Sequence, residues 1–126
     1  MTDGDFGTPE QSVGTMDLTH DWESCMTLVG GQWSWKPSGG MYSLDKTLSI
    51  LVSCVTGGGN LLLNVGPMPT GEIEPRQVER LREVGEWIKP RSEAIYATRG
   101  GPWANGKWGG SSHRGERVYG FARELA

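Results

Sequence analysis

The chain lacks the long apolar runs and basic stripes that mark several common classes of protein. Its longest apolar run, Leu61-Leu62-Leu63, is far shorter than the roughly 20 residues that cross a membrane, so we expect no membrane partner. The net charge is −3 and acidic and basic residues are interleaved, so we do not expect nucleic acid as a partner either. The polar opening residues, Met1 to Asp5, do not resemble a secretory signal peptide, and the sequence leaves the compartment open.

Several catalytic and cofactor motifs are missing as well. Gly57-Gly58-Gly59-Asn60 precedes an apolar run instead of opening a helix, so it cannot present helix-terminal amides to a phosphate. There is no Gly-x-Ser-x-Gly elbow, and His20 and His113 are isolated. Cys25 and Cys54 have no partner at metal-ligand spacing; they are either two small buried hydrophobic residues, which we favour, or one disulfide. We therefore expect no metal and no cofactor.

Glycine is the residue type in excess. It makes up 20 of 126 residues, roughly twice the usual share, and with 7 prolines it predicts a chain rich in turns and loops. A chain of 126 residues can form one small domain with one core. It is too short for a complete (β/α)8 barrel, which needs roughly 200 residues or more.

Short apolar runs alternate with segments of helical periodicity. The predicted elements are a strand over 25–29, a helix over 43–55, a strand over 60–65, a helix from Pro75 to Pro90, an extended piece over 94–97 and a weak strand over 117–121. Ser43 is suited to cap the first helix, Gly57 to follow it at C′, and Pro75 to begin the second. The second helix carries an apolar stripe of Val78, Leu81, Val84 and Ile88.

This order of elements favours βαβ units and a parallel sheet. The strand over 60–65 is apolar without alternation and is bounded by glycine and proline, which is typical of a strand buried on both faces. Two helices and two or three strands cannot close a sheet, and two sheet edges would stay exposed. The sequence therefore predicts an α/β chain that is part of something larger.

Acidic and aromatic residues lie together in the N-terminal loops, in Asp5-Phe6 with Glu10 and in Asp21-Trp22-Glu23. A carboxyl near apolar rings has a raised pKa, as a general acid at neutral pH requires. Aromatic faces also suit the C–H faces of sugar rings. The same residues can equally be solvated loop charges and core tryptophans, and the residue types alone leave both interpretations open.

Longer strings of residues resemble the α-L-fucosidases of glycoside hydrolase family 29. The resemblance runs in order from about Asp3 to Tyr119, and its most specific part is the string Gly58-Gly59-Asn60-Leu61-Leu62-Leu63-Asn64-Val65-Gly66-Pro67 with a helix after it. The other matching stretches are 4–11, 22–27, 78–87 and 93–99. The stretch over 89–92 and the residues after Tyr119 depart from the family pattern.

The resemblance implies the C-terminal portion of a (β/α)8-like barrel, incomplete, with the start of a β-sandwich strand at the C-terminus. Residues 1–99 would belong to the catalytic barrel, and 100–126 would be a linker and the truncated start of the β-domain. The implied activity is hydrolysis of α-L-fucosides with retention, on a fucosylated oligosaccharide or glycoconjugate. Full-length relatives are often secreted, periplasmic or lysosomal, and a homo-oligomer is possible.

The resemblance also assigns roles to single residues. Glu10 matches the general acid/base, and Glu23 is the second choice, with a structural hydrogen bond at a strand start as its alternative role. Trp33 matches the aromatic residue that packs against fucose, and Trp35 can assist it. No stretch matches the family's aspartate nucleophile or its N-terminal histidines. The alternative to an enzyme is therefore a non-catalytic truncated fragment that at most binds sugar weakly.

If the isolated chain were active, another carboxylate would have to replace the missing nucleophile. The acidic residues of the N-terminal loops that we consider for this are Asp5, Asp17, Asp21 and Glu23. Asn60 and Asn64 are expected to satisfy backbone groups around the last strands.

Overall fold

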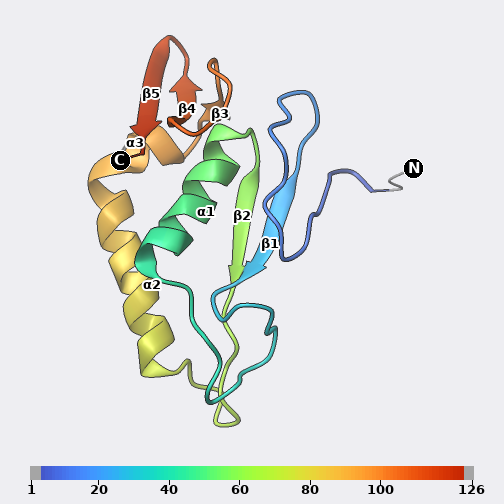
Figure 1. The fold of residues 1–126 in the computed structure, drawn as a ribbon, viewed down its shortest axis with the longest axis vertical. Coiled ribbons are helices and arrows are strands. Elements are labelled where there is room, and N and C mark those ends of the chain that lie inside the picture. The colour runs from blue at the N-terminus through green and yellow to red at the C-terminus, as the bar shows by residue number, and fades with distance from the viewer. Residues whose placement is uncertain (1–3, 124–126) are drawn as a thin grey trace.

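A computed structural model describes residues 4–123 of the chain (Figure 1). Helix α1 lies across one face of a parallel sheet, α2 packs on the far side of α1, and a small antiparallel sheet sits at one end. In chain order the elements are β1 (Glu23–Thr27), α1 (Leu44–Thr56), β2 (Asn60–Asn64), α2 (Pro75–Ile88), the 3-10 helix η1 (Lys89–Arg91), α3 (Ser92–Ile95), β3 (Arg99–Gly100), β4 (Gly109–Arg114) and β5 (Arg117–Ala122).

β1, α1 and β2 form the βαβ unit that the sequence predicts. The two strands are parallel, with Glu23 opposite Asn60 and Thr27 opposite Asn64. The predicted strand over 25–29 is displaced, because β1 begins two residues earlier and ends at Thr27. The second strand begins at the predicted residue and ends one residue earlier than expected.

A third extended segment, residues 7–11, runs parallel to β1 along the edge that β2 does not occupy. Gly7 bridges Trp22 and Glu10 bridges Cys25, with backbone hydrogen bonds of 2.9 Å between the two segments. Three parallel segments therefore lie side by side in the order 7–11, β1, β2. The sequence predicted only loop in this region, because the segment has no run of apolar residues.

The ends of α1 follow from local chemistry. Ser43 has extended backbone angles, and its side chain accepts a hydrogen bond from the Lys46 amide at 3.1 Å, as the predicted N-cap should. The prediction for the other end is wrong by one residue. Gly57 keeps a right-handed conformation, and Gly58 takes the left-handed one at φ +86°. A side chain at Gly58 would also meet the Asp17 carbonyl at 2.6 Å.

α2 begins at Pro75 as predicted, but Pro90 does not break the helical path. Pro90 lies in the first turn of η1, where its missing N–H removes no hydrogen bond. α3 follows directly, so the expected extended piece over 94–97 is wrong: Ser92–Ile95 is helical. The predicted apolar stripe is buried at Val84, whereas Val78 is 37% exposed.

The last third of the chain forms an antiparallel sheet in the order β3-β4-β5. β5 confirms the weak strand expected over 117–121. β4 was not expected, because it contains no large apolar residue. It is buried through small residues instead: Ser111 and Ser112 are fully buried, and a Cβ at Gly110 would lie 2.4 Å from the Thr56 hydroxyl of α1.

The parallel sheet has one covered face and one open face. Trp22 and Met26 pack with Ile50 and Cys54 of α1, and Leu61 and Leu63 join this core. Because side chains alternate along a strand, the remaining residues point to the opposite side, which we call the helix-free face. It carries Glu10, Glu23, Cys25, Thr27, Asn60, Leu62 and Asn64.

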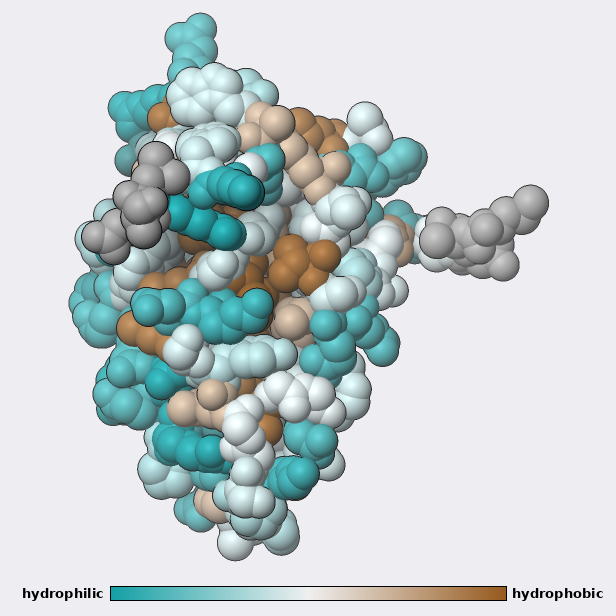
Figure 2. Space-filling model, viewed as in Figure 1, coloured by the Kyte–Doolittle hydropathy of each residue, from teal (hydrophilic) through white to brown (hydrophobic). Residues whose placement is uncertain are grey.

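On the helix-free face Leu62 is 51% exposed, so the expectation of a strand buried on both faces is wrong for this chain. Figure 2, drawn from the same side as Figure 1, shows hydrophobic side chains reaching the surface in the middle of the molecule.

Cys25 and Cys54 lie on opposite sides of the sheet, and both are free thiols, so the disulfide alternative is wrong. Cys54 is fully buried and Cys25 only half-buried.

Candidate functional site

The three parallel segments all run toward the same end of the sheet. At that end residues 30–41, the loop after β1, lie beside the residues that follow β2. We call residues 30–41 the aromatic loop, because Trp33 and Trp35 are both on it. Open α/β sheets and barrels place ligand sites at the carboxyl ends of their strands. This end is therefore the candidate site.

Glu10 lies on the segment over 7–11, opposite Cys25, and its side chain belongs to the helix-free face. The residue after it, Gln11, has a left-handed backbone at φ 51°, which ends the extended segment. The Glu10 side chain is exposed in this chain. The environment of apolar rings that the sequence suggested for this carboxyl is therefore not formed by residues 4–123 around it.

The aromatic loop is held at several points. Its stem closes through the Gly30 amide, which donates to the Gly40 carbonyl at 3.1 Å. The Asn64 side-chain amide donates to the Trp33 carbonyl at 2.9 Å, which confirms the expected backbone-satisfying role of Asn64. The loop also crosses the chain after β2 closely, since a Cβ at Gly66 would lie 2.5 Å from the Trp35 amide nitrogen. Trp33 itself is 42% exposed.

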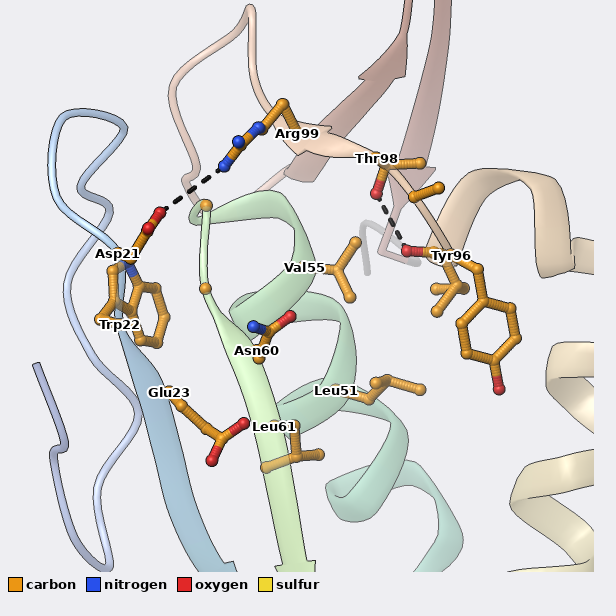
Figure 3. Close-up of a pocket in the computed structure, with 14 residues that line it drawn as sticks. Asp21, Trp22, Glu23, Leu51, Val55, Asn60, Leu61, Tyr96, Thr98 and Arg99 are labelled. Carbon is orange, nitrogen blue, oxygen red and sulfur yellow. Dashed lines mark hydrogen bonds and ion pairs between the residues drawn. The ribbon is translucent and has the colours of Figure 1, made fainter. Parts of the chain in front are cut away.

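Glu23 is placed differently from Glu10. It begins β1, so it lies on the same face but at the amino end of the sheet. There it lines a cavity of about 440 Å³ together with Asn60 and with Leu51 and Val55 of α1 (Figure 3). An exposed ion pair of 3.7 Å between Asp21 and Arg99 spans part of this cavity. Glu10, opposite Cys25 in the middle of β1, thus lies nearer the carboxyl end of the sheet than Glu23 does.

The remaining acidic candidates are loop residues. Asp17 accepts hydrogen bonds from the Thr19 amide at 2.8 Å and from the Thr19 hydroxyl at 2.8 Å, and it pairs with His20 at 3.0 Å. These contacts, the backbone hydrogen bond from Thr19 first, hold the pKa of Asp17 well below its ordinary value. The Asp17 carboxylate therefore stabilises the local loop conformation through its contacts with Thr19 and His20. Asp5 is exposed and Asp21 is paired with Arg99.

One carboxylate that the sequence analysis did not single out is strongly buried. Glu74, the residue before α2, is only 8% exposed, and it lies near the aromatic loop. The sequence shows only an acidic residue before Pro75, a pattern that is typical of an ordinary helix start.

Among residues 4–123 no three His, Cys, Asp or Glu side chains are grouped closely enough to hold a metal ion. Within the same range no helix combines the length and apolar character needed to cross a membrane.

Comparisons with known proteins agree on one family. The sequence profile of the family described as alpha-L-fucosidase matches residues 1–93. An alpha-L-fucosidase of Branchiostoma floridae is 40% identical over 87 residues, which is 67% of this chain and 19% of that protein. The plasma alpha-L-fucosidase of Homo sapiens is 40% identical over 84 residues, 64% of this chain and 18% of that protein. The chain therefore spans about a fifth of the length of these curated relatives.

Solved structures give the same picture for the fold. Alpha-L-fucosidase isoenzyme 1 from Paenibacillus thiaminolyticus superposes with a TM-score of 0.84 at 30% identity, covering 91% of this chain and 29% of that one. The Thermotoga maritima alpha-fucosidase in complex with fucose gives 0.72 at 31% identity, covering 79% and 25%. The chain thus has the α/β fold of one part of these fucosidases.

Proposed function

This chain belongs to the α-L-fucosidase family, glycoside hydrolase family 29, and from that premise we propose that it is the C-terminal part of the catalytic barrel of a retaining α-L-fucosidase. The observation that carries this proposal is the family match over residues 1–93 together with three parallel segments that have helices on one face only. The substrate that this family relationship supports is a fucosylated oligosaccharide or glycoconjugate.

The open surfaces of the chain are those that a barrel would close. In a (β/α)8 barrel the helices lie outside and the opposite face of each strand points into the barrel. The helix-free face corresponds to that interior, and the free edges of β2 and of the segment over 7–11 are where further strands would pair. We propose that residues 1–99 belong to the barrel and that 100–126 begin the following β-domain. The change to antiparallel pairing at β3, which begins at Arg99, supports a boundary close to this position.

We assign Glu10 as the general acid/base and keep Glu23 as the second choice. Both face the barrel interior, but Glu10 pairs with the residue two positions after Glu23, which places it roughly 7 Å nearer the carboxyl end. Barrel enzymes carry their chemistry at that end. Because Glu10 is exposed in this chain, the burial that a general acid requires must come from the rest of the barrel.

The proposed reaction has two steps. A carboxylate nucleophile from the part of the enzyme outside this chain attacks the anomeric carbon, while Glu10 donates its proton to the departing glycosidic oxygen. In the second step Glu10 takes a proton from water as that water attacks the anomeric carbon, which releases fucose and the nucleophile. Trp33, on the aromatic loop at the carboxyl end, is the proposed contact for the apolar side of the sugar.

The test is turnover of an aryl α-L-fucoside by the chain alone and by the chain co-expressed with the upstream barrel part of a related α-L-fucosidase. We expect turnover from the combination. Glu10→Gln should lower kcat by about 10²–10⁴-fold, the usual contribution of general acid/base catalysis, and Glu23→Gln should change it far less. Equal activity of Glu10→Gln and the parent would reject the assignment. No turnover in any combination would support the non-catalytic alternative.

A further inference from the structure

A buried polar cluster lies at the start of α2, beside the aromatic loop. Its centre is Glu74, which is 8% exposed, and its neighbour Gln77 is 1% exposed. The Arg76 Nε and the Gln77 Nε2 each donate to Glu74 at 2.8 Å, and both bonds end on the same oxygen, Oε1. Among the described residues, no hydrogen bond of normal geometry ends on the other oxygen, Oε2. Oε2 is therefore available as an acceptor.

Two buried donors, on residues that lower the pKa of Glu74, also lack partners. The Trp35 Nε1 and the Arg76 Nη2 are both buried without a hydrogen bond among residues 4–123. Burial alone would raise the pKa of Glu74, but the contacts with Gln77, Arg76 and Trp35 outweigh it and leave the pKa lowered. Trp35 is thus one of the groups that lower this pKa, although its indole N–H forms no hydrogen bond of ordinary geometry among residues 4–123. Buried donors are nearly always paired in folded proteins.

A contact between the Trp35 side chain and Glu74 would affect the aromatic loop, because Trp35 lies on that loop. The loop backbone at Trp35 is already in tight contact with Gly66, and the Asn64 side chain holds the carbonyl of Trp33 two residues earlier. These anchors fix the backbone of the aromatic loop on the β2 side only. A contact between the Trp35 side chain and α2 would fix the loop from the second side, and so limit how the exposed Trp33 can move.

We propose that Glu74 is a positioning residue, whose Oε2 accepts the Trp35 indole N–H and so holds the aromatic loop against the start of α2. The role of Trp33 toward sugar rests on the function proposed above, whereas the contact between Glu74 and Trp35 does not. Among residues 4–123 no hydrogen bond links Glu74 to Glu10, so the proposed role of Glu74 is exerted through the loop.

The test uses the whole chain, labelled with ¹⁵N, and follows hydrogen exchange at the indole N–H groups. Trp35→Phe identifies the Trp35 signal by its loss. In Glu74→Ala we expect the Trp35 indole to exchange at least tenfold faster, with a smaller increase in Glu74→Gln. The control is Glu79→Gln, which removes the same charge from an exposed position of α2 and should leave this rate unchanged. An unchanged Trp35 rate in folded Glu74→Ala or Glu74→Gln overturns the proposal.

A reciprocal measurement keeps the test decisive if Glu74→Ala does not fold. Trp35→Phe keeps an aromatic ring but removes the donor, so the pKa of Glu74, followed by carboxyl NMR, should rise. A Glu74 pKa that stays the same in Trp35→Phe contradicts the contact.

Adding L-fucose separates the two proposals. If Glu74 substitutions change the Trp35 exchange rate while no signal responds to L-fucose, the positioning role is supported and the sugar-binding role of the loop is not. If the Trp33 signal responds to L-fucose and the exchange rate of the Trp35 indole N–H is the same in the parent and in the Glu74 variants, the sugar site is supported and the positioning role is overturned.

Discussion

The indole of Trp22 is enclosed by glycines, and this enclosure gives a sharp prediction. Trp22 is 6% exposed, and its Nε1 donates to the Asp17 carbonyl at 3.2 Å, so the ring has little freedom to move. A Cβ at Gly59 would lie 2.4 Å from three atoms of this ring, and a Cβ at Gly14 would lie 2.7 Å from two. Gly59 does not have a left-handed backbone conformation, so a side chain at this position would be disfavoured mainly by its steric contact with Trp22.

We therefore expect Gly59→Ala to destabilise the chain. Overpacking a filled core costs about 1–3 kcal/mol. Alanine loses less unfolded-chain entropy than glycine on folding, which returns about 0.4–1 kcal/mol. Because the 2.4 Å approach is to a ring with little freedom to move, we expect an overpacking cost in the upper half of its range, about 2–3 kcal/mol, and a net loss of about 1–2.6 kcal/mol in the free energy of unfolding. This corresponds to a decrease in Tm of about 4 °C for each kcal/mol in a chain of this size. Urea unfolding followed by far-ultraviolet circular dichroism measures it directly.

Two further variants isolate the cause. Gly85→Ala makes the same chemical change in α2, where a Cβ would meet nothing within 4 Å, and it should stabilise the chain by about 0.8–1 kcal/mol. Trp22→Phe shortens the ring that the new methyl group would strike, so Gly59→Ala should cost less in that background than in the parent. A Gly59→Ala protein as stable as the parent, or an equal cost in both backgrounds, would refute the reasoning from ring contact.

The two thiols and one surface carboxylate give further expectations. A thiol reagent should modify Cys25 at least tenfold faster than Cys54, because Cys54 is fully buried and burial raises its pKa; equal rates would contradict the placement of the two thiols. Tyr119 and Arg117 lower the pKa of Glu93 below its ordinary 4.5, so the stability that Glu93 contributes is present above that value and is lost as pH falls through its folded pKa. Below about pH 4.5 the free energy of unfolding should therefore fall less steeply with decreasing pH in Glu93→Gln than in the parent. An equally steep fall in both proteins would show that the contacts of Glu93 with Tyr119 and Arg117 do not contribute to stability.

The parts of the fold that could be predicted are those with a local signal. α1 has a capping serine and an apolar periodicity of its own, so both its existence and its start were predictable. β4 has no such signal, because it is buried through serines and glycines that fit against α1, and only the three-dimensional contact with Thr56 reveals why. The chain around Pro90 was misjudged for another reason: a proline ends one helix but is also suited to the first turn of the next.

The candidate site was predictable to a lesser extent. Family resemblance selected Glu10, but only the pairing of Glu10 with Cys25 shows that its side chain shares a face with Leu62 and Asn64. Glu74 could not be found from sequence, because its burial is a feature of the tertiary fold for which the local sequence gives no signal. The exposure of Glu10 was also unpredictable, since it depends on which neighbouring strands are present.

The geometry of the sheet explains why this chain can carry the acid/base residue proposed above, Glu10, yet depend on other residues for the proposed catalysis. A retaining glycosidase needs two carboxyl groups about 5–5.5 Å apart, which is close to the spacing between neighbouring strands. The strand neighbour of Glu10 on one side is β1, where the opposite residue is Cys25 and not an acid. Its other side is the open edge of the segment over 7–11. Glu23 is the nearest acid of β1 on this face, but it lies two residues before Cys25 and so only diagonally from Glu10. A nucleophile directly beside Glu10 would come from a strand that pairs at that edge, or from a partner that lies over the helix-free face.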